Sequence, residues 1–301
     1  MTTPRPRHPR KPKAARWETR PREGARPAVV VVGFGRLGGA LSLGLHRAGW
    51  PLTVFPRSAA SVKRAAELGL RLAEHDALRA AKICVLAVPD AVVGTLAQTL
   101  LPDLSAHAAL VHCAGALDLT AFGEQPQMLK RARGSFHPLC AVSSLEDELA
   151  GHAVALSATS AGLTRTLEWM AEDLRLTAIK VPEAQRPAYH AGAVLSAGGL
   201  VSLASAAVQS LGLAGIPEDA ALEALLPLMK SALRGLEKRG LTGGITGPVA
   251  RGDASVVRAH LKALPPELAS LYRALSRRAL ARLRDTLPPE ARNELEQLLS
   301  G

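Results

Sequence analysis

Three glycines, Gly33, Gly35 and Gly38, follow four valines and open an apolar, helix-like run in VVVVGFGRLGGALSLGLHRAGW. Between a strand and a helix, a G-x-G-x-x-G pattern is typical of a turn that holds the pyrophosphate of a dinucleotide. The first glycine permits the tight turn, the second leaves room for the phosphates, and the third lets helix and strand pack closely. The helix N-terminus attracts the anion. We predict that the turn binds a cofactor through Gly33, Phe34, Gly35, Arg36, Leu37 and Gly38; the alternative is a sharp turn without a ligand.

The end of the next predicted strand selects the dinucleotide. NAD-binding units usually place Asp or Glu there to bind the ribose 2′-hydroxyl, whereas an arginine accommodates the 2′-phosphate of NADP. This chain has Arg57 and Ser58 at that point, in LTVFPRS, and Lys63 and Arg64 follow in the next helix, where they add positive field. The sequence therefore favours NADP over NAD, unless Arg57 is only a solvated loop cation.

Two further loops are expected beside the cofactor at the carboxyl edge of the sheet. The segment LAVPDAVV brings Val88 and Pro89 there, and Asp90 is interpreted mainly as a helix N-cap. The segment VHCAG adds His112 and Gly115.

Hydride transfer to a C=O or C=N bond needs a proton donor and a group that polarises the acceptor. His190 is the best candidate for the acid and base, because the unperturbed pKa of histidine lies near neutrality. Ser196 and Thr246 offer hydroxyl groups, and Arg251 can hold a carboxylate. Each has a structural alternative: His190 packs within a helix, and Arg251 pairs with Asp253.

A metal site is the competing interpretation of four of these residues. His112, Cys113, His137 and Cys140 supply two nitrogen and two sulfur ligands, which suit zinc. Neighbouring residues on a strand point to opposite faces, however, so His112 and Cys113 are poorly placed to share an ion. We therefore expect no metal, and His137 then fixes its own loop or contributes to the site.

The elements that position these residues alternate between strands and helices up to about residue 182. Strands are predicted at 28–32, 52–55, 83–88, 108–113, 152–158 and 177–181, with helical patterns around 36–48, 59–68, 90–100 and 162–174. This alternation indicates a doubly wound parallel α/β (Rossmann) sheet covered on both faces. Only helices are predicted afterwards, at about 218–238, 253–263, 266–285 and 289–299. The domains are thus a tail at 1–26, a dinucleotide-binding domain at 27–182, and an all-helical substrate and dimerisation domain at 183–301.

Composition and charge restrict the class of protein. Hydrophobic residues make up 48% of the 301 residues but aromatics only 3%, so the core must be aliphatic. The net charge of +11 is concentrated in residues 1–26, which hold nine Lys or Arg against two Glu. This proline-broken tail is predicted to be disordered, and either solubilises the chain or makes a weak contact with polyanions such as nucleic acid. Three cysteines without a C-x-x-C pair, and no signal peptide, indicate a cytoplasmic protein.

An uncharged stretch of 26 residues, 191–216, is long enough to cross a bilayer. Sixteen of these residues are Ala, Gly or Ser, so the stretch is only mildly apolar. Small residues favour close helix contacts, and we predict a buried helix that forms a homodimer, with no membrane contact.

The ordered set of motifs resembles a known family. GxGxxG, AVPD, HCAG, HPL, YHAGAV and above all TGPVARGD are similar to the Rossmann-like proteins that carry the domain of unknown function 2520, relatives of pyrroline-5-carboxylate reductases, ketopantoate reductases and deazaflavin-dependent NADP oxidoreductases. The resemblance covers about residues 28–285, and it implies an NADP-dependent oxidoreductase-like fold with a helical dimerisation domain. One departure is Gly198, where such proteins tend to have an Asn that orients a substrate.

We therefore predict an NADP-dependent oxidoreductase that transfers a hydride between the cofactor and a small carbonyl or imine compound. The alternative, which Gly198 favours, is an NADP-binding sensor or scaffold that has lost turnover.

Overall fold

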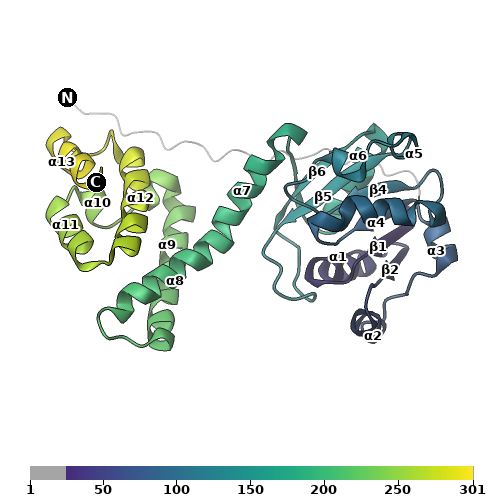
Figure 1. Cartoon of the computed structure of the whole chain (residues 1–301), viewed down its shortest axis with the longest axis horizontal. Coiled ribbons are helices and arrows are strands. Elements are labelled where there is room, and N and C mark those ends of the chain that lie inside the picture. The colour runs from purple at the N-terminus through teal and green to yellow at the C-terminus, as the bar shows by residue number, and fades with distance from the viewer. Residues whose placement is uncertain (1–24, 301) are drawn as a thin grey trace, which may run out of the picture. The chain divides into compact units, whose positions relative to one another are not determined.

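The computed structural model describes residues 25–300, and the predicted tail at 1–26 lies almost entirely outside this range. The chain divides into two compact units, with the division between Ala191 and Gly192. The sequence predicts a boundary near residue 182, whereas η4 (Glu183–Gln185) and the start of α7 (Arg186–Ser196) belong to the first unit and not to the helical one. Each unit is described by itself (Figure 1).

The first unit is built on a seven-stranded sheet with the order β2-β1-β3-β4-β5-β6-β7. Its strands are β1 (Val29–Val32), β2 (Leu52–Phe55), β3 (Ile83–Leu86), β4 (Ala109–His112), β5 (Arg133–Leu139), β6 (Ala153–Ala158) and β7 (Thr177–Lys180). The doubly wound α/β class is confirmed, and all six predicted strands are present, each within two residues of its predicted bounds.

The expectation of a wholly parallel sheet is wrong at one position. The segment GSFHPLC, interpreted as a loop, is part of β5, which pairs parallel with β4 and antiparallel with β6. Gly134 and Pro138 lie in this strand and weaken its sequence signal, because glycine and proline are depleted in strands. β6 and β7 therefore run opposite to the first five strands.

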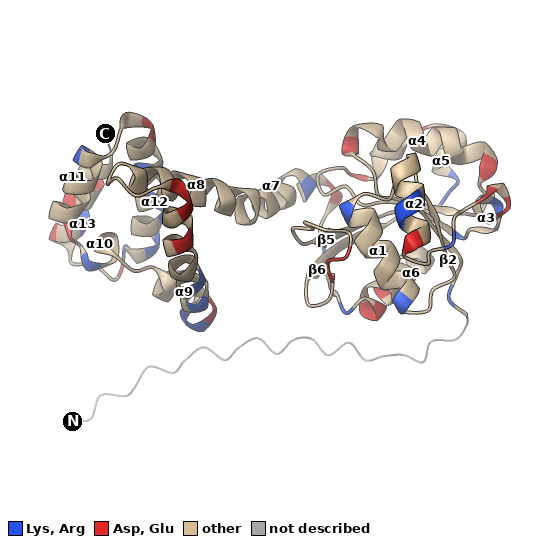
Figure 2. Cartoon of the chain, turned by 90° about the horizontal axis from the view of Figure 1, so that it is seen from below, with Lys and Arg blue, Asp and Glu red and all other residues tan. Residues whose placement is uncertain are grey.

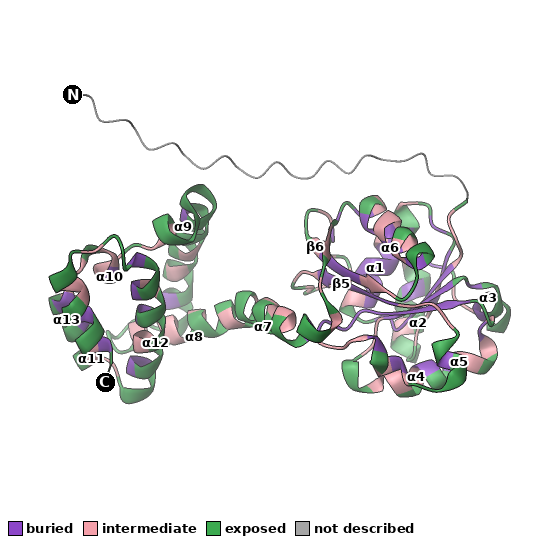
Figure 3. Ribbon diagram, turned by 90° about the horizontal axis from the view of Figure 1, so that it is seen from above, coloured by how far each residue is buried: buried purple, intermediate pink, exposed green. Residues whose placement is uncertain are grey.

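Helices cover both faces of the sheet, and each face has its own core. Val29 and Val31 of β1 face the core formed with α1 (Arg36–Arg47) and α6 (Ala161–Asp173). Val30 and Val32 face the core formed with α3 (His75–Ala80), α4 (Val93–Leu100) and η3 (Leu119–Phe122). This explains the unbroken valine run, because a strand buried on both faces needs no polar alternation. Figure 3 shows the sheet buried between its covering helices. The remaining short elements of this unit are α2 (Ala59–Glu67), η1 (Asp90–Val92), η2 (Leu101–Asp103) and α5 (Pro126–Leu129).

The second unit is helical, as predicted. It contains the end of α7 and then α8 (Gly198–Gly212), α9 (Glu218–Gly244), α10 (Pro248–Arg251), α11 (Ala254–Ala263), α12 (Pro266–Leu283) and α13 (Pro289–Leu299). Its small core includes Val249, Val257, Leu280, Leu295 and Leu299. The predicted caps are confirmed: Asp253 accepts a hydrogen bond from Val256 N at 3.2 Å, and Pro266 and Pro289 begin their helices.

The small-residue segment differs from the single long helix that was predicted. It forms two helices, since the backbone at Ala197 leaves helical geometry (φ −106°, ψ −80°) between α7 and α8. It is also not buried within the chain. The continuous stretch Glu183–Gly212 is long and apolar enough to cross a membrane by length and composition, and none of its most apolar window is buried. Figure 2 draws it free of charged residues beyond the first turn of α7.

Candidate cofactor and active site

In the turn between β1 and α1, two positions can be occupied only by glycine. Gly33 has φ +97°, in the region that side chains rarely adopt, and a Cβ there would overlap the carbonyl oxygen of Ala87. A Cβ on Gly38 would overlap the carbonyl oxygen of Gly33. A Cβ on Gly35 would have no atom within 4 Å. Gly33 and Gly38 are therefore required by the fold, whereas Gly35 faces open space.

The N-terminus of α1 fits a diphosphate. Gly35 is its N-cap residue and makes no side-chain capping bond, and the first turn contains no acidic residue. The first N–H groups of the helix are thus left for another acceptor, and the helix dipole favours an anion there. Arg36, the first helical residue, is exposed and adds a positive charge.

A cavity of about 440 Å³ lies against this turn. It brings together residues from five predicted segments: Gly35, Arg36, Leu37, Gly38, Ala87, Val88, Pro89, Asp90, Cys113, Ala114, Gly115, His137, Pro138, Cys140, Val142 and His190. The loops at the carboxyl ends of β1, β3 and β4 and one end of β5 therefore meet the start of α7 at a single site, as ligand sites do in doubly wound folds. Phe34 does not line the cavity and instead packs in the hydrophobic core.

Arg57 and Ser58 follow β2 at the same edge of the sheet, and both are exposed. The hydroxyl of Ser58 caps α2 by accepting a hydrogen bond from Ser61 N at 3.2 Å. The two later cations are partly neutralised, since Lys63 lies near Glu67 and Arg64 pairs with Glu67 and Glu146. Arg57 is thus the better placed of these cations to bind an added phosphate.

Two histidines face each other across Gly115. A Cβ on Gly115 would overlap His190 Nδ1 and come within 2.8 Å of His137 Nε2, so the glycine leaves space that both imidazoles border. The ring centroids of His137 and His190 are 5.6 Å apart. His190 Nδ1 is buried and has no hydrogen-bond partner among the described residues. Buried polar atoms are normally paired, so this nitrogen is suited to a partner that the chain does not supply.

Tyr189 contacts the Nδ1 side of the His137 ring. The hydroxyl oxygen of Tyr189 lies 2.8 Å from His137 Nδ1, and the rings meet edge to face. Burial is the main cause that lowers the pKa of His137 to about 4, with further contributions from His190, Arg186 and His112. His137 is therefore neutral at physiological pH.

His112, predicted to contact the cofactor, lies at the end of β4 and is fully buried. It does not line the cavity and stacks near Phe122, with ring centroids 5.3 Å apart. Burial and the charge of Arg186 lower its pKa to about 4.

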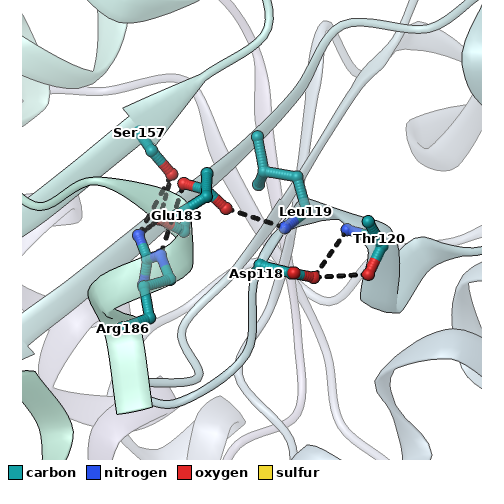
Figure 4. A network of polar contacts seen from close by, with 7 residues as sticks. Asp118, Leu119, Thr120, Ser157, Glu183 and Arg186 are labelled. Carbon is teal, nitrogen blue, oxygen red and sulfur yellow. Dashed lines mark hydrogen bonds and ion pairs between the residues drawn. The ribbon is translucent and has the colours of Figure 1, made fainter. Parts of the chain in front are cut away.

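A polar network that the sequence pattern does not predict supports the histidines. Arg186 is fully buried and donates hydrogen bonds to Ser135 and, at 3.0 Å, to Ser157. Its Nε lies 3.4 Å from Glu183, whose other carboxylate oxygen accepts from Leu119 N at 2.9 Å (Figure 4). One signal was available: Arg186 is the last Lys or Arg before a long uncharged run, and it precedes His190 by one helical turn.

The residues considered for zinc do not form a cluster. Within residues 25–300, no group of three or more His, Cys, Asp or Glu is arranged to hold a metal ion. Burial raises the pKa of Cys113 to about 12, so this thiol is protonated.

Comparison with known proteins agrees with this geometry. Residues 152–279 match the family model of the domain of unknown function DUF2520, and residues 28–115 match that of the coenzyme F420-dependent NADP oxidoreductases. The segment similar to DUF2520 thus follows a segment similar to the nucleotide-binding domain of those oxidoreductases. The resemblance seen in its motifs is thereby confirmed. No match to a curated protein was found.

Solved structures share the fold. Protein BF3122 from Bacteroides fragilis has a TM-score of 0.68 at 23% identity, covering 84% of this chain and 98% of its own. Protein TM1727 from Thermotoga maritima has a TM-score of 0.68 at 24% identity, covering 86% and 99%. Pyrroline carboxylate reductase from Plasmodium falciparum, with NADP bound, has a TM-score of 0.59 at 13% identity, covering 91% and 98%. Together the matches support an NAD(P)-dependent oxidoreductase.

Three predicted catalytic residues lie in the second unit, within the segment that matches DUF2520. Ser196 ends α7 and its hydroxyl donates to Gly192 O at 2.8 Å. Thr246 and Arg251 are exposed, in the turn before α10 and at the end of that helix. Asp253 is engaged as the cap of α11, where hydrogen bonds from Ser255 and Val256 lower its pKa. Gly198 begins α8, and a Cβ there would have no atom within 4 Å.

Proposed function

We propose that this DUF2520 protein is an NADP-dependent oxidoreductase that reduces a small carbonyl or imine compound. One observation carries the proposal: the glycine turn, the loops after β3 and β4, and His137 and His190 border the same cavity of about 440 Å³. A bound reduced nicotinamide would supply the hydride. The N-terminus of α1 would hold its diphosphate, and Val88 and Pro89, which line the same cavity, would contact it.

His190 completes the reaction in this proposal. With the hydride supplied to the carbon of the C=O or C=N bond, His190 would give its proton to the oxygen or nitrogen, so that the product would be an alcohol or an amine. Water then returns a proton to His190. The cavity borders both the cofactor turn and His190, so the substrate has to be small.

The test is a binding and turnover experiment with the full chain. We expect heat on titration with NADPH and oxidation of NADPH, followed at 340 nm, with at least one member of a panel of 2-oxo acids and cyclic imines. No heat with either NADPH or NADH would refute the proposal. Tight binding without oxidation by any panel member would favour the sensor or scaffold, for which the glycine at position 198 is the specific observation.

Arg57 is proposed to select NADP. We expect Arg57→Ala to weaken NADPH binding by about 10- to 100-fold and to leave NADH binding unchanged, since a hydrogen bond to a charged group contributes about 1.5–3 kcal/mol. Calorimetry with both cofactors measures this. Arg79→Ala removes an exposed charge from α3 of the same unit and is the matched control. An equal loss of affinity for NADPH and NADH would show that Arg57 does not bind the 2′-phosphate.

We also propose that two copies of the chain associate through the helical unit. Apolar side chains are exposed along α7, α8 and α9, among them Leu195 (73% exposed), Val201 (70%) and Leu228 (65%). A groove of about 880 Å³ between α8, α9 and α12 is lined mostly by leucine and alanine. Monomers rarely leave apolar patches of this kind uncovered.

Light scattering after gel filtration tests the association. We expect the wild type to elute at twice the chain mass and Leu195→Glu with Val201→Glu to elute as a monomer. Leu129→Glu, at an exposed leucine of α5 in the first unit, is the control and should stay dimeric. A wild-type monomer, or cosedimentation with phosphatidylcholine vesicles, would contradict the dimer.

A further inference from the structure

Strand β5 and helix α7 meet through two matched pairs of side chains. Ser135 and His137 are two residues apart and so lie on one face of the strand. Arg186 and Tyr189 are three residues apart and lie on one face of the helix. Arg186 donates to Ser135, and Tyr189 bonds His137 at 2.8 Å. The start of α7 is therefore in register with the strand that carries His137.

Arg186 fixes this register. Its side chain has no exposed surface, and it also bonds Ser157 of β6, which lies opposite Ser135 in the sheet. Glu183 pairs with it and reaches Leu119 N. A buried charge is costly unless it is paired and hydrogen-bonded. The guanidinium is therefore restricted to positions in which these partners are in reach. The network ties α7 to β5, β6 and η3.

The surroundings of His137 keep its ring neutral. The titratable and charged groups that face it are His190, Tyr189 and Arg186 from α7, His112 from β4, and Cys140 from the segment after β5. Burial of the ring is the main factor that disfavours a second proton on His137, and the nearby charges of His190 and Arg186 add to it. The pKa of His137 is lowered to about 4.

The tautomer of the neutral ring follows from its partner. A phenol is a stronger acid than a neutral imidazole N–H, and an imidazole nitrogen is a stronger base than a phenol oxygen. Tyr189 therefore donates its hydroxyl hydrogen to His137 Nδ1, and burial that raises the pKa of Tyr189 keeps the phenol protonated. The remaining ring hydrogen is then on Nε2, which borders the space beside Gly115 in the cavity.

We propose that His137 donates its Nε2 hydrogen to the acceptor oxygen or nitrogen of the substrate, with Tyr189 selecting the tautomer and Arg186 positioning both. This rests on the proposed function, and it adds the polarising group that hydride transfer needs. A neutral donor fixed where negative charge develops stabilises that charge without losing its own proton. His137 and His190 then have separate roles, since the first polarises the bond and the second gives the proton.

The first test needs no turnover. In the full chain labelled with ¹⁵N-histidine, NMR should show His137 in the Nε2–H form and without titration between pH 5.5 and 8. Tyr189→Phe should mix the two tautomers, whereas Arg186→Met should raise the pKa of His137 only in part and leave the ring neutral in this range, because burial is the main cause of the lowered pKa. The chain contains a matched control: His260 Nδ1 lies 2.9 Å from the hydroxyl of Tyr272 in the second unit, so Tyr272→Phe should leave the His137 signals unchanged.

The second test is kinetic. With a panel compound that is turned over, we expect Tyr189→Phe to lower kcat by about 10-fold and His137→Ala by about 100-fold, with NADPH binding unchanged, because loss of one such donor costs about 10² to 10³ in rate. If Arg186→Met does not fold, Ser135→Ala, which loosens Arg186 but keeps its charge, replaces it and should give a smaller loss of kcat than Tyr189→Phe.

The outcomes separate this proposal from the broader one. An Nδ1–H tautomer in the wild type, a titration of His137 above pH 5.5, or unchanged kcat in Tyr189→Phe overturns the role of His137 and leaves the oxidoreductase intact. A wild type that binds neither NADPH nor NADH overturns the proposed function itself.

Discussion

The Gly35→Asp variant is expected to lose at least about 100-fold in affinity for both NADPH and NADH while unfolding at the same urea concentration as the wild type. The two effects separate because of where Gly35 lies. Its backbone is extended (φ −81°, ψ −167°), which any residue adopts, and its Cβ position has no neighbour within 4 Å. Aspartate is also a favourable N-cap, so the change costs no stability and adds a few tenths of a kcal/mol to the free energy of unfolding.

Cofactor binding, in contrast to stability, is expected to weaken. A carboxylate at the N-terminus of α1 occupies the place where the diphosphate has to approach the backbone, and like charges in contact cost several kcal/mol. Calorimetry with both cofactors and urea denaturation measure the two quantities on the same sample. Gly162→Asp is the matched control: it places the same residue in the first turn of α6, where a Cβ has open space and which does not line the cavity beside α1. Unchanged cofactor affinity in Gly35→Asp would exclude the glycine turn as the phosphate site.

The sequence was informative where local pattern decides structure. The four valines of β1 and the glycines after them identified the strand, the turn and the helix, because burial on both faces and the φ of Gly33 act within a few residues. Asp253 was recognised as a cap for the same reason. The loops after β1, β3 and β4 were placed at one edge because parallel strands bring their carboxyl ends together.

Long-range pairing was not predictable in this way. β5 contains Gly134 and Pro138, and its pairing with β6 depends on a strand about 20 residues further along the chain. The burial of Arg186 has the same origin, since its two serine partners are 51 and 29 residues away. An arginine beside prolines in a sequence is expected at the surface, and only the fold shows that two strands enclose it. The uncharged stretch was predicted to be buried in a homodimer, and in the single chain none of its most apolar window is buried, so its small residues alone do not identify what covers it.

The His190→Ala variant is expected to lose about 10² to 10⁴ in kcat while its NADPH affinity stays within about twofold of the wild type. Transfer of a proton by a positioned side chain contributes that much to a rate, and the variant removes the donor without touching the glycine turn. The position of His190 supports the role: its Nδ1 is buried without a partner among the described residues and borders the cavity beside Gly115.

The alternative role, a histidine packed within a helix, makes a different prediction. A packing residue would change the urea midpoint when truncated, and kcat per folded molecule would stay the same. His190→Gln keeps much of the volume and a hydrogen-bond donor but cannot shuttle a proton at neutral pH, so it should lose nearly as much kcat as His190→Ala. His75→Ala, at an exposed histidine that begins α3 and pairs with Asp103, controls for loss of a surface imidazole and should turn over normally. A His190→Gln variant with more than about half of the wild-type kcat would assign the proton to another group, and His137 would then be the first to examine because it borders the same space.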